Sequence, residues 1–166
     1  MMPLAQALRA RVLAADSVTE AMSGWCASRG VGRLPLRSEV HVRAEAAAAP
    51  AEFAAEAAGE RVFFRRITLL AGHVPLLDAD NWFLPDRLPA GALALLQGGD
   101  TPFGAALPPG RQTRRSTAVL VPPGAAIPPG GRAAPGVALL DLQGLVSLDG
   151  RPVAFVEERF RVEALG

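Results

Sequence analysis

The stretch of sequence that decides the fold lies near the C-terminus: Asp149-Gly150-Arg151-Pro152-Val153-Ala154-Phe155-Val156-Glu157-Glu158-Arg159-Phe160-Arg161-Val162. An Asp-Gly pair is the signal for a tight two-residue turn between antiparallel strands. The residues after it alternate with a period of two, as in a strand that buries one face. We therefore predict a hairpin with strands over residues 137–148 and 151–162.

The alternation in this strand places a carboxylate on the apolar face. One face carries Ala154, Val156, Glu158, Phe160 and Val162. The opposite face carries Glu157 and the arginines that follow it. Burying an ionised carboxylate is costly unless it is paired or protonated. Glu158 is therefore the first candidate functional residue.

An arginine occupies a similar position upstream. In the strand expected over residues 61–71, Arg65 shares a side with Phe63 and Ile67. If both strands belong to one sheet, an inward guanidinium and an inward carboxylate face the same cavity, which makes a site for a small anion. The same pattern is compatible with a structural ion pair, or with a sheet whose apolar face is the other one. The alternation does not choose between these interpretations.

Length and composition bound the class of protein. A chain of 166 residues with 50% hydrophobic and 20% charged residues fits one soluble globular domain over residues 1–166. No apolar run reaches the roughly 18 residues that a membrane span needs. The N-terminus lacks the charged-then-apolar order of a secretory signal, so we expect a cytoplasmic protein. A net charge of +1 provides no broad field for nucleic acid, and no nucleic-acid partner is expected.

The residue types present exclude several kinds of chemistry. All 17 basic residues are Arg, which excludes a Schiff-base lysine and a phosphate loop with its lysine. Cys26 is the only cysteine, so there is no intrachain disulfide and no thiolate zinc cluster. The two histidines, His41 and His73, lie far apart in the sequence and give little support for a metal site. We expect neither a metal nor a cofactor.

The remaining pattern predicts an α+β fold. Ser17-Val18-Thr19-Glu20 has the form of a capping box and predicts a helix over residues 18–28. Further strands are expected over residues 38–43, 61–71, 75–84 and 111–121, with a short helix over 91–96. Residues 44–59 are a broken helix or a connection. Residues 122–136, rich in Pro and Gly, are expected to form a long loop that is either a lid or a disordered insertion. The sum is an antiparallel sheet of about six strands with helices.

Four short motifs, in this order, resemble the chorismate pyruvate-lyase family. They lie at residues 16–19, 64–69, 101–104 and 149–160, and the resemblance runs from about residue 12 to the C-terminus. Members of that bacterial family convert chorismate to 4-hydroxybenzoate and pyruvate, the first step of ubiquinone biosynthesis, without a cofactor. Their fold is an antiparallel sheet with helices packed on one side and the ligand enclosed beneath flaps. The resemblance implies a chorismate lyase-like fold, a small-molecule substrate and a monomer.

The resemblance also assigns site residues. The family's substrate-binding arginine falls on Arg65, and its catalytic glutamate falls on Glu158. Counting without a gap from Gly150 selects Glu157 instead, but the alternation favours Glu158, and a one-residue bulge absorbs the difference. Two further substrate contacts fall on Val18 and on the turn that contains Phe103 and Gly104.

A second hypothesis comes from departures from the family pattern. Residues 80–85 differ from the corresponding family strand, and residues 139–147 lack the Arg-Arg-Ser pattern that precedes the last hairpin. Asp80 and Asn81 are then either pocket residues for a different ligand or an exposed strand end. The same fold serves as the small-molecule sensor domain of certain bacterial transcription regulators, and fold alone does not fix function. The alternative is therefore a non-catalytic binding protein for a small aromatic carboxylate.

Overall fold

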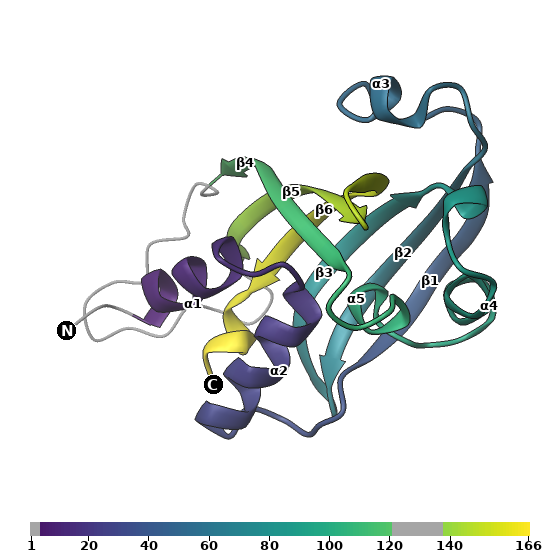
Figure 1. Cartoon of the computed structure of the whole chain (residues 1–166). Helices are drawn as coiled ribbons and strands as arrows, with labels where there is room; N and C mark the ends of the chain where they lie inside the picture. The colour runs from purple at the N-terminus through teal and green to yellow at the C-terminus, as the bar shows by residue number, and fades with distance from the viewer. Residues whose placement is uncertain (1–3, 121–137) are drawn as a thin grey trace.

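The fold is built on one antiparallel sheet of six strands, in the order β1-β2-β3-β6-β5-β4 (Figure 1). The structure is a computed structural model that describes residues 4–120 and 138–166. The strands are β1 (Arg37–Ala46), β2 (Val62–Ala71), β3 (Val74–Phe83), β4 (Gln112–Leu120), β5 (Ala138–Leu148) and β6 (Arg151–Arg161). The prediction of an α+β fold with about six antiparallel strands is confirmed.

Two hairpins meet at the centre of this sheet. β2 pairs with β3 and β5 pairs with β6, and the contact of β3 with β6 joins the two halves. The predicted turn between β5 and β6 is present: Asp149 and Gly150 both have positive φ, 51° and 79°. Two successive residues with positive φ match the right-handed twist of the strands they connect. The last hairpin therefore follows directly from its Asp-Gly pair.

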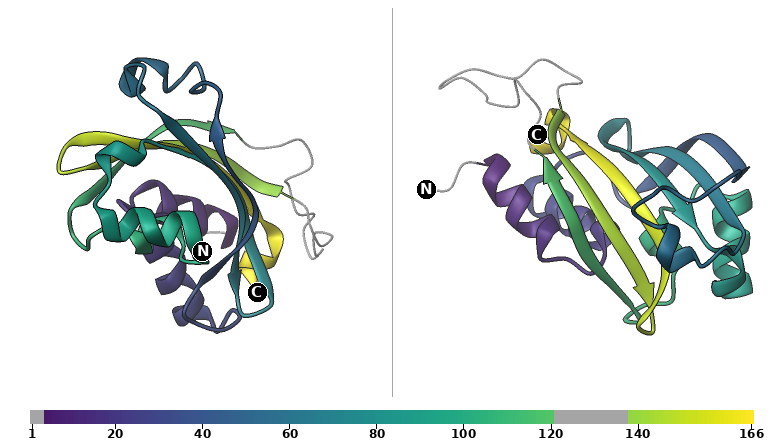
Figure 2. Two further views of the ribbon diagram at one scale, coloured as in Figure 1. Left: turned by 90° about the vertical axis from the view of Figure 1, so that its right-hand side faces the viewer. Right: turned by 90° about the horizontal axis from the view of Figure 1, so that it is seen from above.

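Helices cover one face of the sheet, which we call the inner face (Figure 2). They are α1 (Leu4–Leu13), α2 (Val18–Arg29), α4 (Ala90–Gly98) and α5 (Phe103–Ala106). The single turn α3 (Ala54–Ala57) lies over one end of the opposite, outer face, and two 3-10 turns follow β3 and β6 at Pro85–Arg87 and Val162–Leu165. The chorismate lyase-like arrangement, with its helices packed on one side, is thereby confirmed.

The helix α2 begins and ends where its sequence predicts. The Ser17 hydroxyl accepts a hydrogen bond from the Glu20 backbone N–H, and Gly30 ends the helix with a φ of 66°. The hydroxyl satisfies an N–H that has no acceptor inside the helix, and glycine adopts the left-handed conformation without a Cβ clash. This cap fixes the N-terminus of α2 against the inner face.

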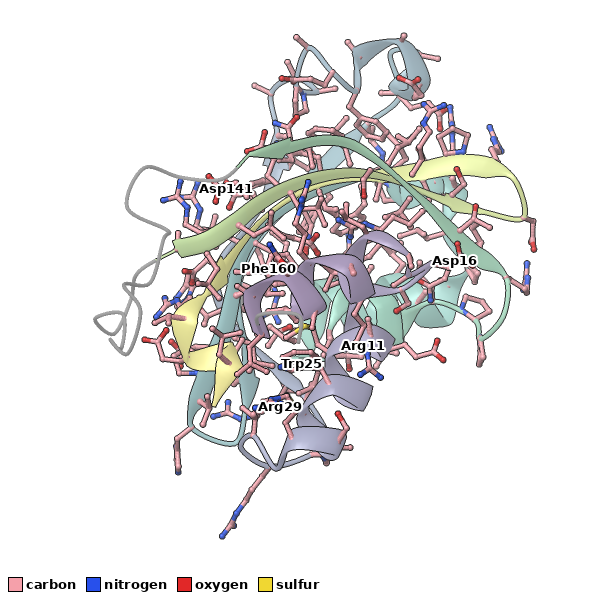
Figure 3. The ribbon with its side chains drawn as sticks, turned by 90° about the vertical axis from the view of Figure 1, so that its left-hand side faces the viewer. Arg11, Asp16, Trp25, Arg29, Asp141 and Phe160 are labelled. Carbon is pink, nitrogen blue, oxygen red and sulfur yellow. The ribbon has the colours of Figure 1, made fainter. Side chains whose placement is uncertain are left out.

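The core fills the space between these helices and the sheet. Trp25 of α2 donates its indole N–H to the Ala164 carbonyl at 2.7 Å, which ties the helix to the C-terminal turn. Figure 3 shows Trp25 and Phe160 between the helices and the sheet, and Asp141 on the other side. A second cluster, around Phe83 and Leu96, packs α4 and α5 against the other end of the inner face. Between the two clusters the inner face carries polar side chains.

The outer face is polar apart from a patch beneath α3. Phe53 packs there against Phe155 and the half-buried Trp82. Elsewhere on this face arginines pair with aspartates across neighbouring strands. The pairs are Arg66 with Asp80, Arg159 with Asp141 and Arg161 with Asp78. The alternation of the strands thus separates an apolar inner face from a charged outer one.

Several sequence-based expectations need adjustment. Residues 44–59 contain the end of β1 and only one helical turn, and the turn at residues 101–104 leads into the short helix α5. The expected long loop over residues 122–136 lies outside the described residues. No helix in the described part of the chain is both long and apolar enough to cross a membrane.

Candidate functional site

The polar side chains of the inner face come from neighbouring strands in one register. Arg65 of β2 lies opposite Asn81 of β3, which lies opposite Val156 of β6, which lies opposite Gly144 of β5. Side chains at paired positions lie on the same face of a sheet. The strands therefore present Arg65 and Asn81 side by side beneath the helices.

Glu158 lies on the inner face, and its partner is an arginine from the far edge of the sheet. The Arg114 side chain of β4 donates from Nη2 to Oε1 of Glu158. Both side chains are buried, with 4% of Arg114 and 8% of Glu158 exposed. A buried carboxylate needs a partner of this kind. The structure thus gives Glu158 a counter-ion that is not Arg65.

Gly144 makes this ion pair sterically possible. A Cβ at position 144 would lie 2.8 Å from Cζ, Nε and Nη2 of Arg114. The guanidinium therefore crosses β5 through the space that any other residue at position 144 would fill. A glycine within a strand often marks such a close approach.

Arg65 is the largest fully buried side chain among the residues whose burial the structure describes, and it has few hydrogen bonds. It is 0% exposed, and its Nη2 donates to the Thr101 carbonyl at 2.8 Å. Its Nε and Nη1 have no hydrogen-bond partner in the described part of the chain. Burial, with the neighbouring positive charge of Arg43, lowers the pKa of Arg65 to about 10. The charge of Asp100 opposes this fall in the pKa, and the guanidinium is still charged at neutral pH; among the described residues no carboxylate accepts a hydrogen bond from it.

Two small cavities lie between the inner face and the helices, each of about 30 Å³. Five residues line both of them: Val18, Thr19, Asn81, Phe103 and Glu158. We call the two cavities together the inner chamber. Each has room for little more than a water molecule. Arg65 borders neither cavity, although its cross-strand neighbour Asn81 borders both.

The helix ends that close the chamber pack tightly together. Gly104 of α5 sits so close to α2 that a Cβ there would lie 2.5 Å from the Ser17 hydroxyl. Its carbonyl accepts a hydrogen bond from the Gln112 side chain at 2.8 Å. The Phe103 ring, half buried beside it, packs on Phe83 with ring centroids 6.0 Å apart. Phe103 and Gly104 thus form one wall of the chamber and Val18 another.

Unpartnered polar atoms gather around the chamber. In the described residues, five buried side-chain atoms of four inner-face residues lack a hydrogen-bond partner: Ser38 Oγ, Arg65 Nε and Nη1, Asn81 Oδ1 and Arg114 Nε. Buried polar atoms are nearly always hydrogen-bonded, so each exception needs a reason. Ser38, Asn81 and Arg114 border the cavities. Within the described structure, the inner chamber is therefore the place where the polar groups of a ligand could form hydrogen bonds with the largest number of unpartnered protein atoms.

A larger hollow of about 450 Å³, the outer trough, lies on the opposite face of the sheet. Arg66, Asp80 and Glu157 are among the residues that line it. Most of its charges pair across neighbouring strands, as Arg66 does with Asp80. Glu157 accepts a hydrogen bond from the Gln143 amide, and burial followed by the charge of Asp80 raises the pKa of its carboxyl. We favour the inner chamber despite its smaller volume, because polar groups of the trough already have partners.

The structure brings together some of the expected site residues and separates others. Val18, Phe103 and Glu158 line the same chamber, whereas Glu157 lies on the outer face. Arg65 faces inward but does not pair with Glu158, so the expected shared cavity of that carboxylate and that guanidinium is not observed. The described residues contain no group of three or more His, Cys, Asp or Glu placed to hold a metal ion.

Sequence reasoning missed Arg114 and left Asn81 undecided. Arg114 lies on an edge strand with few apolar residues, so no alternation showed which way it points. The available signal was Gly144, a gap in the otherwise apolar series Leu140, Leu142 and Val146. Asn81 is 3% exposed on the inner face, so the interpretation as an exposed strand end is wrong for this residue.

Comparison with known proteins identifies the fold. No protein-family model and no curated protein matches the sequence. The effector domain of PhnF from Mycobacterium smegmatis matches with 14% identity and a TM-score of 0.52, over 87% of this chain and 88% of that domain. PhnF itself matches with 13% identity and a TM-score of 0.50, over 87% of this chain and 63% of PhnF. A GntR-family transcriptional regulator from Enterococcus faecalis V583 matches with 11% identity and a TM-score of 0.43, over 78% and 91%.

The likeness to the effector domain of PhnF corrects the functional prediction. At 14% identity it shows the fold alone, and that fold is the one of the effector domain of PhnF. The prediction of a lyase that converts chorismate in ubiquinone biosynthesis is therefore wrong, and so is the prediction of an enzyme. The four motifs that led to this prediction are short, and they lie on helices, strands and turns that form the fold itself. The catalytic roles assigned to Glu158, Arg65 and the alternative Glu157 are withdrawn with it.

Proposed function

We propose that the inner chamber binds a small aromatic carboxylate as an effector and releases it chemically unchanged. The observation that carries this proposal is the set of unpartnered polar atoms on the inner face. Those of Ser38, Asn81 and Arg114 border the chamber, and Nε and Nη1 of the fully buried Arg65 belong to the strand next to Asn81. A guanidinium forms its strongest hydrogen bonds with carboxylates. A ligand carboxylate would supply the acceptors that the protein itself lacks here.

The chamber walls suit an aromatic ring. Phe103 lines both cavities and packs on Phe83, which in turn packs on Phe63 with ring centroids 5.2 Å apart. Aromatic pairs at such distances prefer offset or tilted contacts, which a planar ligand can extend. A flat ring could pack beside Phe103 while its carboxylate points along the paired residues Asn81 and Arg65 toward the guanidinium. Such a ligand would contact both the aromatic side chains and the unpartnered guanidinium.

Entry of such a ligand requires the chamber to open. Sites for drug-sized ligands occupy roughly 300–1,000 Å³, whereas each cavity here measures about 30 Å³. The elements above the chamber are the four-residue helix α5 and the first turn of α2, which are joined to the rest of the chain by short connections. We infer that ligand binding moves α5 away from the sheet. Such a movement would make the conformation of the domain depend on whether the ligand is bound.

Binding measurements on a matched pair of variants test the proposal. Calorimetric titration with benzoate, and with benzamide as its uncharged analogue, compares wild type with Arg65→Gln and Arg66→Gln. Arg66 is the next residue along the strand, but it pairs with Asp80 on the outer face. Loss of a hydrogen bond to a charged group corresponds to about a tenfold loss of affinity or more. We expect that loss for benzoate in Arg65→Gln alone, weak binding of benzamide, and recovery of unchanged benzoate by mass spectrometry.

Two results would contradict the proposal. One is equal affinity of wild type and Arg65→Gln for benzoate, which would remove Arg65 from the site. The other is equal affinity of wild type for benzoate and benzamide, which would show that the carboxylate is not recognised.

A further inference from the structure

The ion pair between Arg114 and Glu158 is incomplete. A carboxylate and a guanidinium often form two parallel hydrogen bonds. Here the Arg114 guanidinium donates to Glu158 from Nη2, while its buried Nε has no partner in the described part of the chain. Arg114 therefore has a hydrogen-bond donor, Nε, that does not bind Glu158.

Glu158 lines both cavities of the inner chamber. Asn81 also lines both, while Arg114 lines the first and Ser38 the second. The two cavities are therefore adjacent at the five residues that line both, Glu158 and Asn81 among them. Withdrawal of the Glu158 carboxylate from Arg114 would join the two cavities into one larger space bordered by an unpaired guanidinium.

The N-terminus of α2 faces the same point. Val18 and Thr19, the first two residues of this 12-residue helix, line both cavities. The first N–H groups of a helix have no acceptor within it and favour an anion. Ser17 already satisfies the N–H of Glu20. With Arg114 on the opposite wall, an anion in the joined space would meet donors from both the sheet and the helix.

We propose that Glu158 is a built-in substitute for a second anionic group of the ligand. It holds Arg114 while the chamber is empty and releases it when the ligand's own anion takes its place. This proposal deepens the proposed function and rests on it. Arg114 is then the second anion-binding residue of the chamber, and Gly144 gives its side chain the path to reach there.

The spacing of the two arginines defines the ligand class. Arg65 lies on β2 and the Arg114 guanidinium reaches Glu158 on β6, two strands away in the order β2-β3-β6. Two strand spacings amount to about 10 Å, and Glu158 lies two residues beyond Val156, the residue in register with Arg65, so the two strand positions are about 12 Å apart. A six-membered aromatic ring with anionic groups at opposite positions, such as a 1,4-dicarboxylate, suits guanidinium groups that approach from both ends. The preferred effector is therefore dianionic.

Sulfate binding tests the release of Arg114 without any knowledge of the effector. Its affinity is measured at constant ionic strength for wild type, Glu158→Gln, and the double variant Glu158→Gln with Arg114→Gln. Removing the competing carboxylate while keeping the side-chain volume frees Arg114. We expect sulfate to bind Glu158→Gln about tenfold more tightly than wild type or better, since one charged hydrogen bond corresponds to that factor. The double variant should lose this gain.

Equal sulfate affinity of wild type and Glu158→Gln would overturn the proposal, because Glu158 would then not compete for an anion site. Glu158→Asp keeps the charge but shortens the side chain, and it serves if Glu158→Gln does not fold. We expect it to bind sulfate more tightly than wild type, and an unchanged affinity would likewise overturn the proposal.

Aromatic probes separate this proposal from the proposed function. Glu158→Gln should bind benzene-1,4-dicarboxylate more tightly than wild type does, with little change for benzoate. If benzoate binds through Arg65 but Glu158→Gln alters neither sulfate nor dicarboxylate affinity, the proposed function stands and the role of Glu158 is wrong. If sulfate binds Glu158→Gln but no aromatic carboxylate binds any variant, the anion site stands and the proposed function is wrong.

Discussion

Gly144 and Arg114 depend on each other across neighbouring strands: a Cβ at position 144 would lie 2.8 Å from the Arg114 Cζ. We expect Gly144→Ala to push the guanidinium away from Glu158 and to destabilise the protein by about 1–3 kcal/mol, the usual cost of overpacking a core. Urea unfolding measures the change. Gly91→Ala on α4 is the control, since nothing lies within 4 Å of its added Cβ. Alanine should stabilise that helix by up to about 1 kcal/mol, and equal stabilities of the two variants would contradict the steric argument.

Glu157 and Glu158 lie on opposite faces of the sheet, and their substitution by Gln should change the free energy of unfolding in opposite directions. Glu158→Gln leaves the buried Arg114 without its counter-ion, and we expect a loss of about 3 kcal/mol or more. Glu157→Gln removes a charge whose pKa is raised by burial and then by Asp80. A raised carboxyl pKa means that ionisation disfavours the folded state, so this variant should gain up to about 1 kcal/mol at pH 7.

The pH dependence of this pair provides the check. The penalty at Glu157 is complete above its folded pKa and disappears below its unfolded pKa of about 4.3. The advantage of Glu157→Gln over wild type should therefore shrink as the pH falls from 7 toward 4, in urea unfolding at each pH. Destabilisation by both variants at pH 7 would contradict the assignment of the two faces.

Asp78 should stabilise the protein at neutral pH and lose that effect in acid. Burial raises the pKa of this carboxyl, but hydrogen bonds from Arg161 and Thr68 outweigh it and hold the pKa below its usual value. A lowered pKa contributes stability that is present above the unfolded pKa, about 3.9, and is lost as the pH falls through the folded pKa. Because the side chain is 40% exposed, we expect Asp78→Asn to cost less than about 1 kcal/mol at pH 7.

Thermal unfolding from pH 7 to pH 2 checks this prediction. The difference between wild type and Asp78→Asn should close below pH 4. Asp86→Asn, which breaks a pair with Arg61 on the surface, is the control and should change less. A difference that persists unchanged at pH 2 would show that Asp78 acts through packing and not through its charge.

We expect Arg65 to lower the free energy of unfolding, although it is needed for ligand binding. A buried guanidinium with two unpartnered nitrogens is costly, and an apolar side chain of similar length is often neutral or stabilising at such a site. We expect Arg65→Met to gain about 1 kcal/mol in urea unfolding and to lose benzoate binding. Arg66→Met, which breaks an exposed pair, should lose less than about 1 kcal/mol. Strong destabilisation by Arg65→Met would identify Arg65 as a structural residue.

Much of the fold was predictable because its signals are local. The alternation after Arg151, the turn at Asp149-Gly150 and the Ser17 cap each act within a few residues, and each appears in the structure. The inward position of Arg65 followed from its apolar neighbours on the strand.

The partners of the inner-face charges were not predictable in the same way. The pairing of Arg114 with Glu158 depends on two strand contacts and on a side chain that crosses a third strand at Gly144. The sequence of β4 contains no local pattern that predicts where the Arg114 side chain points. The function was mistaken for a related reason: the fold was predicted correctly, but one fold can host unrelated functions, so the fold did not establish an activity.

Chemical-shift mapping with benzoate tests the central claim, that the inner chamber is the ligand site, most directly. Backbone amide signals of uniformly ¹⁵N-labelled protein are followed during a titration, for wild type and Arg65→Gln. We expect the largest shifts at Val18, Asn81 and Phe103, and their loss in Arg65→Gln. Shifts centred on His41 and Gln143 in the outer trough, or no shifts with benzoate at all, would contradict the account.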